Sequence, residues 1–166
     1  MEIQVDQEKF ETVGEPVSVG MELPHFKVFD QNNNKVKTAD LLGKVTLISV
    51  VPNINTDICS LQTKHFNEIV DKYTDINFVT ISTNTVVEQS DWCAAEGVEN
   101  MQMLSDEEES FGYAMNLYVP GTAFDARSIY IVDAQGVVVY QQIVTITGTE
   151  PDYADAQAKL DEILAK

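Results

Sequence analysis

The residue with the clearest capacity for chemistry is Cys59, one of two cysteines in the 166-residue sequence. It follows shortly after residues 45–51, a nearly continuous apolar run that predicts a strand buried on both faces. We expect a helix directly after this strand, with Cys59 in its first turn. Free backbone N–H groups and the positive end of the helix dipole favour a thiolate at such a position. We therefore interpret Cys59 as a reactive thiol, although an arbitrary cysteine is more often buried and inert.

Four other residues are expected to act on Cys59. Thr56 stands three residues earlier, where its hydroxyl could hydrogen-bond the thiolate or a bound oxygen atom. Pro52 ends the strand and shields the loop. Asp57 opposes the thiolate, because a nearby carboxylate disfavours a second negative charge. A cation is therefore required, and Arg127, at the edge of a predicted strand, is the candidate.

The second cysteine, Cys93, lies in another predicted helix. A Cys59–Cys93 disulfide would close a loop of about 35 residues and add about 3–4 kcal/mol of stability by chain entropy. A chain of this length can bury a full core without that crosslink. Two cysteines in a cytosolic chain are usually unrelated thiols. If these two do pair, redox chemistry is the better reason.

The charge of the chain excludes some classes of partner. Ten Lys and Arg stand against 27 Asp and Glu, for a formal net charge of −17. Such a surface repels nucleic acid and anionic lipid, and a solubility role is its simplest explanation. No apolar run is long enough to span a membrane, and the N-terminus shows no basic segment followed by an apolar one. We expect a cytoplasmic protein with no nucleic-acid or membrane partner.

Hydrophobic periodicity predicts a single α/β domain over residues 1–166. The predicted strands are the short apolar or alternating segments 26–29, 45–51, 76–81, 101–104, 128–132 and 137–140. The predicted helices follow the strands, at residues 58–73, 87–95 and 107–115, with a last one starting after residues 149–152. Residues 128–140 form a hairpin around the polar turn 133–136. This order indicates a mixed central sheet with helices on both faces, as in the thioredoxin fold.

Two local expectations are more specific. Residues 9–19 predict an N-terminal β-hairpin turned at Gly14 and Glu15. The helix that carries Cys59 is expected to bury the apolar residues that recur at helical spacing. These are Ile58, Leu61, His65, Ile69 and Tyr73.

Residues 52–59 match a known family signature: a proline, three residues, a threonine, two residues and a cysteine. The sequence resembles the peroxiredoxin family, and within it the atypical two-cysteine branch of bacterial thiol peroxidases. Cys93 in its segment 91–97, the arginine segment 126–128 and the tetrapeptide 150–153 are similar to that branch. The resemblance covers roughly residues 10–164, and the order of all four segments makes it specific.

The resemblance implies a thioredoxin-dependent peroxidase that reduces hydrogen peroxide and organic hydroperoxides without a cofactor or metal. Cys59 resembles the peroxidatic cysteine and Cys93 the resolving cysteine of an intrasubunit disulfide. Thr56 and Arg127 resemble the groups that orient the peroxide and hold the thiolate, and Pro52 resembles the shield. Members of the branch are typically homodimers.

The chemistry of these residue types fits that implication. A thiolate that attacks a peroxide oxygen becomes a sulfenic acid and releases water or an alcohol. Hydrogen-bond donors must support charge on the oxygens as the O–O bond breaks. The sulfenic acid then condenses with a second thiol, and a dithiol reductant opens the disulfide by exchange.

Three other interpretations compete with a peroxidase. A thioredoxin-like reductase would show a Cys-x-x-Cys pair, which the sequence lacks. A zinc site from Cys59, Cys93, His25 and His65 lacks metal-ligand spacing, and we expect His65 to be an ordinary helix residue. A redox sensor or disulfide relay would use the same two cysteines, and the sequence does not separate it from an enzyme.

Overall fold

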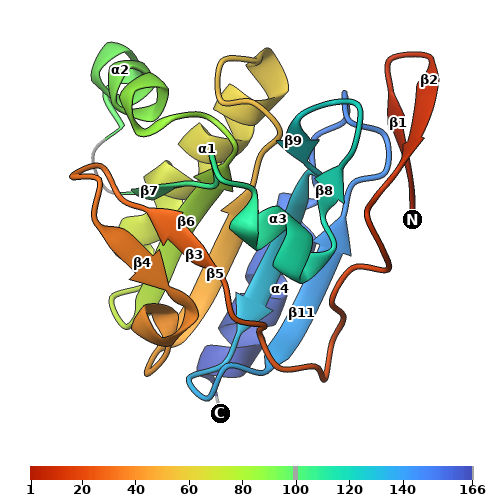
Figure 1. Ribbon diagram of the computed structural model, residues 1–166. Coiled ribbons are helices and arrows are strands. Elements are labelled where there is room, and N and C mark those ends of the chain that lie inside the picture. The colour runs from red at the N-terminus through yellow and green to blue at the C-terminus, as the bar shows by residue number, and fades with distance from the viewer. Residues whose placement is uncertain (99–100, 166) are drawn as a thin grey trace.

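A computed structural model describes residues 1–98 and 101–165. Its centre is a seven-stranded mixed sheet in the order β11-β10-β5-β6-β7-β3-β4 (Figure 1). The strands β5, β6 and β7 are parallel, and the others join antiparallel on either side. Their bounds are β3 Lys27–Phe29, β4 Lys35–Lys37, β5 Val45–Val50, β6 Ile76–Ser82, β7 Gln102–Ser105, β10 Ser128–Val132 and β11 Val138–Ile143.

Helices cover both faces of this sheet. The four α-helices are α1 Asp57–Ile69, α2 Val86–Glu96, α3 Ser110–Met115 and α4 Tyr153–Leu164, and short 3₁₀ helices span Thr38–Leu41 (η1) and Val70–Lys72 (η2). One core cluster joins side chains of α1, α2 and α4 to one face, and the other joins α3 and the N-terminal segment to the opposite face. The predicted mixed sheet with helices on both faces is confirmed. No helix among the described residues is long and apolar enough to cross a membrane.

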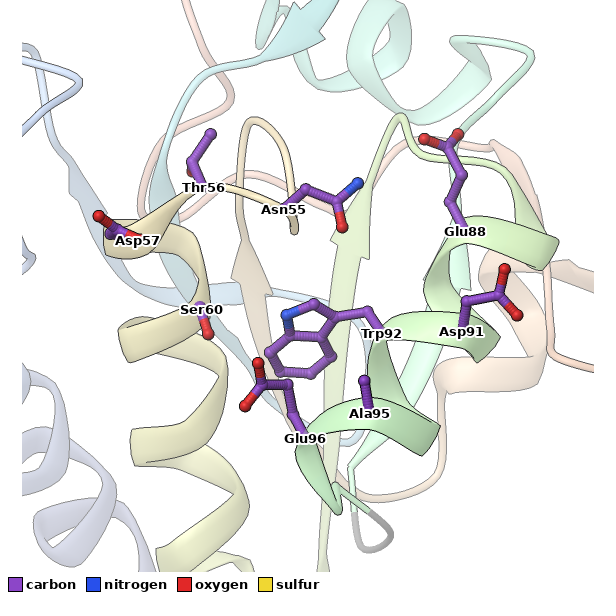
Figure 2. Close-up of a pocket in the computed structure, with 9 residues that line it drawn as sticks. All are labelled: Asn55, Thr56, Asp57, Ser60, Glu88, Asp91, Trp92, Ala95 and Glu96. Carbon is purple, nitrogen blue, oxygen red and sulfur yellow. The ribbon is translucent and has the colours of Figure 1, made fainter.

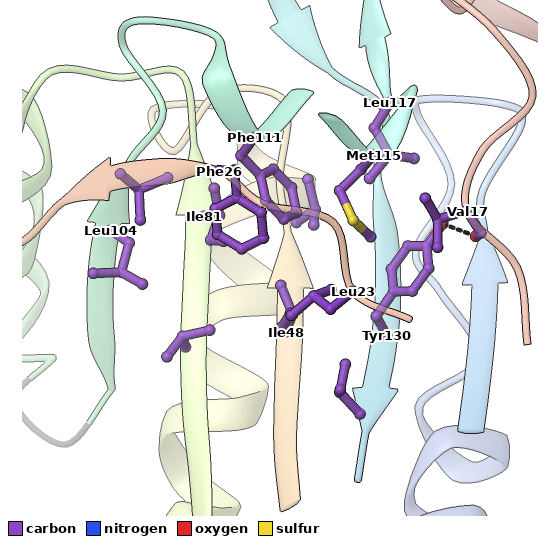
Figure 3. Close-up of a cluster of buried hydrophobic side chains, with 14 of the residues drawn as sticks. Val17, Leu23, Phe26, Ile48, Ile81, Leu104, Phe111, Met115, Leu117 and Tyr130 are labelled. Atoms are coloured by element: carbon purple, nitrogen blue, oxygen red, sulfur yellow. Dashed lines mark hydrogen bonds between the residues drawn. The ribbon is translucent and has the colours of Figure 1, made fainter. Parts of the chain in front are cut away.

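The central strands are buried on both sides, as their apolar runs predict. In β5, Leu47 packs into the α1 face and Ile48 into the α3 face, because successive side chains of a strand alternate. Figure 3 shows the α3 side of this core, where the Tyr130 hydroxyl donates to the Val17 carbonyl at 2.7 Å. That bond ties the N-terminal segment to β10, the strand that follows Arg127.

The N-terminal hairpin exists, but its predicted position at residues 9–19 was wrong. It is formed by β1 (Glu2–Val5) and β2 (Glu8–Glu11), and it turns at Asp6, whose φ of 54° is left-handed. Residues 12–19 form no strand; their backbone bonds go elsewhere, from Val13 N to Tyr118 O and from Val17 N to Met115 O. Alternation of residue types cannot distinguish a hairpin from a segment that bonds to distant loops.

The predicted buried face of α1 was also partly wrong. Leu61 is 49% exposed, and the buried positions are Cys59, Gln62, Thr63, Phe66 and Ile69. Two of them are polar and find partners inside the protein. Gln62 Nε2 donates to Ser49 Oγ at 2.8 Å, and Thr63 Oγ1 donates to the Cys59 carbonyl at 2.9 Å. Apolar periodicity misses a face that contains satisfied polar side chains.

A buried pair of acids holds the segment just before Arg127. Asp125 ends β9 (Phe124–Asp125), which pairs with β8 (Tyr118–Val119), and it is fully buried beside the nearly buried Asp106. Asp106 accepts from the backbone N–H groups of Phe111 and Gly112 at 2.8 and 2.9 Å, so it caps α3. The sequence predicted that this helix begins at residue 107. The cap explains why α3 begins at Ser110 instead. A Cβ atom at Gly112 would overlap the Asp125 carboxyl, so glycine is required there.

We expect the two acids to share a proton in this arrangement. Burial raises the pKa of Asp125 well above its usual range, and the charge and hydrogen bond of Asp106 raise it further. No other described residue hydrogen-bonds the Asp125 oxygens. We therefore expect Asp125 to keep its proton and to donate it to the Asp106 carboxylate, whose pKa burial also raises.

We predict that Asp125→Asn makes stability less dependent on pH. In the wild type the folded state keeps a proton that the unfolded chain releases, so folding stability falls as pH rises above about 4 toward the raised pKa of Asp125. An asparagine amide can donate to Asp106 without that proton. The free energy of unfolding should be measured with denaturant at pH 5 and at pH 8. From pH 5 to pH 8, the free energy of unfolding of the variant should rise by more than about 1 kcal/mol relative to that of the wild type. Parallel profiles would contradict the shared proton.

Candidate active site

Cys59 lies where the chain leaves the central sheet. β5 ends at Val50, Thr56 is the N-cap residue of α1, and Cys59 falls in the first turn of that helix, as predicted. The side chain is fully buried. Two donors reach its sulfur: the backbone N–H of Asn53 and the Arg127 Nη2, both at 3.4 Å. A thiolate at this position is therefore stabilised by the N–H dipole of Asn53 and by the positive charge of Arg127.

The Arg127 guanidinium is buried, with 2% of the residue exposed, and every one of its nitrogens is bonded. Nε and Nη2 donate to the Thr147 carbonyl at 3.1 and 3.0 Å, and Nη1 donates to Gln62 Oε1 at 3.1 Å. Nη2 also reaches Cys59. The planar fork of arginine allows these bonds to form together, so the cation is fixed in one orientation. Arg127 is the cation that the sequence nominated, and it lies beside Cys59.

Gln62 belongs to this site, and the sequence reasoning missed it. Its Nε2 donates to Ser49 Oγ and to the Val50 carbonyl, which leaves Oε1 directed at Arg127. Gln62 follows Cys59 by three residues, and that helical spacing places both side chains on one face. This spacing was the available signal. A buried glutamine one turn beyond a reactive cysteine must have partners, and a nearby arginine is an obvious one.

Thr56 and Pro52 lie at the site and line its pocket. The Thr56 hydroxyl donates to the Asn53 carbonyl at 2.9 Å, so the expected bond from Thr56 to Cys59 is not made in this structure. Both residues line a pocket of about 330 Å³ together with Asn53 and Arg127. A hydroperoxide in that pocket would meet Thr56 if the hydroxyl rotated away from Asn53.

This pocket lies next to Cys59, which is fully buried and does not itself line it. Two of its lining residues, Asn53 and Arg127, are those bonded to the sulfur. The rest come from the end of β1 and the turn after it, the loop before α1 and its first turn, β9 and the segment before α4. They are Val5, Asp6, Pro52, Thr56, Asp57, Ile58, Phe124, Thr147 and Gly148. Four stretches that are distant in sequence therefore meet over one cysteine.

A larger hollow of about 440 Å³ lies between α1 and α2 (Figure 2). Neither Asn53 nor Arg127, the two residues bonded to the Cys59 sulfur, lines this hollow, so its size does not make it the reactive site. In Figure 2 the Trp92 ring extends from α2 toward Ser60 on α1. The two helices are also joined across their exposed surfaces by a 2.7 Å ion pair between Lys64 and Glu96.

Cys93 is a free, half-buried thiol on α2, next to Trp92. Cys59 is also free, and both side chains belong to the core cluster on the α1 face. Burial raises the pKa of the Cys93 thiol, which keeps it protonated and unreactive while α2 stays folded. The structure thus brings Arg127, Thr56 and Pro52 to one pocket, places Cys59 beside it against Arg127, and leaves Cys93 on the neighbouring helix.

Residues 150–153 contain the N-cap of α4 and a tyrosine that packs α4 against α1. Asp152 caps α4 by accepting from Asp155 N, and the Tyr153 ring stacks on His65 with centroids 4.0 Å apart. Burial and a hydrogen bond to Glu150 raise the pKa of Tyr153, so its hydroxyl stays protonated. His65 Nε2 lies 3.1 Å from Gln157 Oε1. His65 is thus engaged between two helices, as expected of an ordinary helix residue.

A buried arginine beside a cysteine in the first turn of the helix after a central strand defines a thiol-based redox site on a thioredoxin-like fold. The chain has the fold of a peroxiredoxin-like protein from Aquifex aeolicus, with a TM-score of 0.90 and 23% identity over 97% of this chain and 96% of that one. A thiol peroxidase from Chromobacterium violaceum is similar, with a TM-score of 0.87 and 18% identity over 97% and 95% of the two chains.

Residues 19–141 match the AhpC/TSA family, and the chain belongs to this family. It is 39% identical to a thiol peroxidase of Bacillus subtilis over 142 residues, which cover 85% of each protein. It is 37% identical to a thiol peroxidase of Staphylococcus aureus over 90% of this chain and 92% of that protein. The resemblance found in the motifs is confirmed by these similarities.

Proposed function

We propose that the protein is a thiol peroxidase that reduces hydrogen peroxide and organic hydroperoxides with Cys59 and is recycled by thioredoxin. The observation that carries the proposal is the Cys59 sulfur, bonded by Asn53 N and Arg127 Nη2 at the edge of a pocket. Membership of the AhpC/TSA family and the names of its relatives support the same activity. A homodimer is part of this proposal.

In the first step the Cys59 thiolate attacks the terminal oxygen of the hydroperoxide. An S–O bond forms, the O–O bond breaks, and the departing oxygen leaves as water or an alcohol after it takes up a proton. Arg127 faces the developing negative charge, and Gln62 and Thr147 keep its guanidinium from turning away. Such fixed donors lower the barrier because they need no reorganisation as the charge moves.

In the second step Cys93 attacks the Cys59 sulfenic acid, and water leaves as the disulfide forms. A disulfide requires Cα atoms within about 7 Å, so α1 and α2 must reach that geometry. Partial unwinding of α2 would expose Cys93 and remove the burial that raises its pKa. Two electrons from thioredoxin then restore both thiols by disulfide exchange.

The test is consumption of hydrogen peroxide and of cumene hydroperoxide with thioredoxin, its reductase and NADPH. The wild type should turn over many times, whereas Cys93→Ser should consume about one equivalent and then stop, because its sulfenic acid has no partner thiol. Mass spectrometry should find one added oxygen in the stalled variant. Equal steady-state turnover by Cys93→Ser would remove Cys93 from the cycle. A stable mixed disulfide with one protein and no turnover would favour a relay.

A further inference from the structure

The mouth of the Cys59 pocket carries more negative than positive charge. Arg127 is the only cation among the lining residues that the structure describes, and it is occupied by the Cys59 sulfur. The negative charge of a Cys59 thiolate and the positive charge of the Arg127 guanidinium cancel. Two carboxylates, Asp6 and Asp57, remain on the lining. Neither forms an ion pair with a residue that the structure describes.

The rest of the lining is mainly apolar. Val5, Pro52, Ile58 and Phe124 surround the two carboxylates. Such walls bind the hydrocarbon part of a hydroperoxide, because they lose water contact when it enters. The pocket therefore offers apolar contact to any alkyl or aryl group and repulsion to an added negative charge.

Asp6 is held at this mouth by the N-terminal hairpin. Gln4 on β1 bonds to the segment before α4 in both directions, from Gln4 N to Thr145 O at 2.7 Å and from Thr147 N to Gln4 O at 2.9 Å. On the other side Phe10 packs against Gly121, where the missing Cβ atom leaves room for the ring. The turn residue Asp6 is thus placed by two fixed contacts and not by a free tail.

We propose that Asp6 is a specificity-determining residue that makes this site discriminate against hydroperoxides carrying a carboxylate near the peroxide group. The inference rests on the proposed peroxidase function. Neutral alkyl and aryl hydroperoxides and hydrogen peroxide enter without penalty, and anionic ones of the same size are disfavoured. Two unit charges about 7 Å apart in a water-like medium change a rate about threefold, so Asp6 alone contributes a factor of that order.

The experiment compares cumene hydroperoxide with its para-carboxylate derivative, which adds one negative charge to the same skeleton. The measured quantity is the ratio of kcat/KM for the neutral to the anionic substrate, at low ionic strength. Asp6→Asn should lower this ratio about threefold. Asparagine tolerates the left-handed backbone at this position, so the substitution preserves the turn. Raising the salt to about 0.3 M should reduce the ratio of the wild type, because mobile ions screen an exposed charge.

Glu8→Gln is the matched control. It removes the same charge from the same hairpin, but Glu8 does not line the Cys59 pocket. Its ratio should equal that of the wild type. Equal changes of the kcat/KM ratio in both variants would indicate a general effect of net charge and would contradict a local role of Asp6. An unchanged ratio in Asp6→Asn would also overturn the proposal. Failure of the wild type to consume both cumene hydroperoxide and hydrogen peroxide would instead refute the peroxidase function.

Discussion

Replacement of Cys59 with serine is expected to abolish peroxide reduction. A serine hydroxyl is almost entirely protonated at neutral pH, and no described residue is placed as a base to activate it: the two groups at the Cys59 sulfur, Asn53 N and Arg127, are donors. Consumption of hydrogen peroxide in the thioredoxin-coupled assay should fall to the rate measured without protein. Multiple turnovers by Cys59→Ser would refute the assignment of Cys59 as the nucleophile.

Two controls separate lost chemistry from lost structure. The Cys59 side chain is fully buried, so the variant must first show a cooperative unfolding transition close to that of the wild type. Cys93→Ser supplies the matched comparison, because it removes the other thiol and should still reduce about one equivalent of peroxide. If Cys59→Ser reduces no peroxide while Cys93→Ser reduces one equivalent, Cys59 is the nucleophile. This comparison does not depend on the reductant.

The position of Cys59 was predictable because its causes are local. The apolar run of β5 predicts a buried strand, and the helix that follows sets the cysteine in a first turn. The cation could be nominated because Asp57 and the acidic composition oppose a thiolate, and Arg127 stands at the edge of a predicted strand that leads into the sheet. The structure places Arg127 at the sulfur, and its role in reaction stays a prediction.

The parts that escaped prediction depend on contacts between distant residues. Its spacing to Cys59 places Gln62 on the same helix face, but its role in fixing the cation is recognisable only once Ser49 and Arg127 are known to lie on either side of it. The Asp106–Asp125 pair joins the segment after β7 to β9, and an acidic residue in such a chain is usually assumed to be solvated. The N-terminal hairpin was predicted at the wrong position because glycine at position 14 was the stronger local signal for a turn. The turn forms instead at Asp6, which adopts a left-handed backbone.

Arg127→Met is expected to slow the first turnover with hydrogen peroxide by about 10²–10³-fold, the usual effect of removing one donor from an oxyanion-type site. A unit charge 4 Å from another at an effective dielectric of about 20 interacts by about 4 kcal/mol before screening, so the loss of this cation also disfavours the thiolate. The first-turnover rate and the pH profile of Cys59 alkylation, both measured in a Cys93→Ser background, report the two effects separately.

Arg127→Lys separates charge from geometry. Lysine keeps the positive charge, but a single ammonium cannot reproduce the bonds that arginine makes to Thr147 and Gln62 while it reaches Cys59. Its first-turnover rate should lie between those of the wild type and Arg127→Met. An Arg127→Met variant whose alkylation profile and first turnover match the wild type would contradict the prediction. The Asn53 N–H and the start of α1 would then be sufficient to support the thiolate.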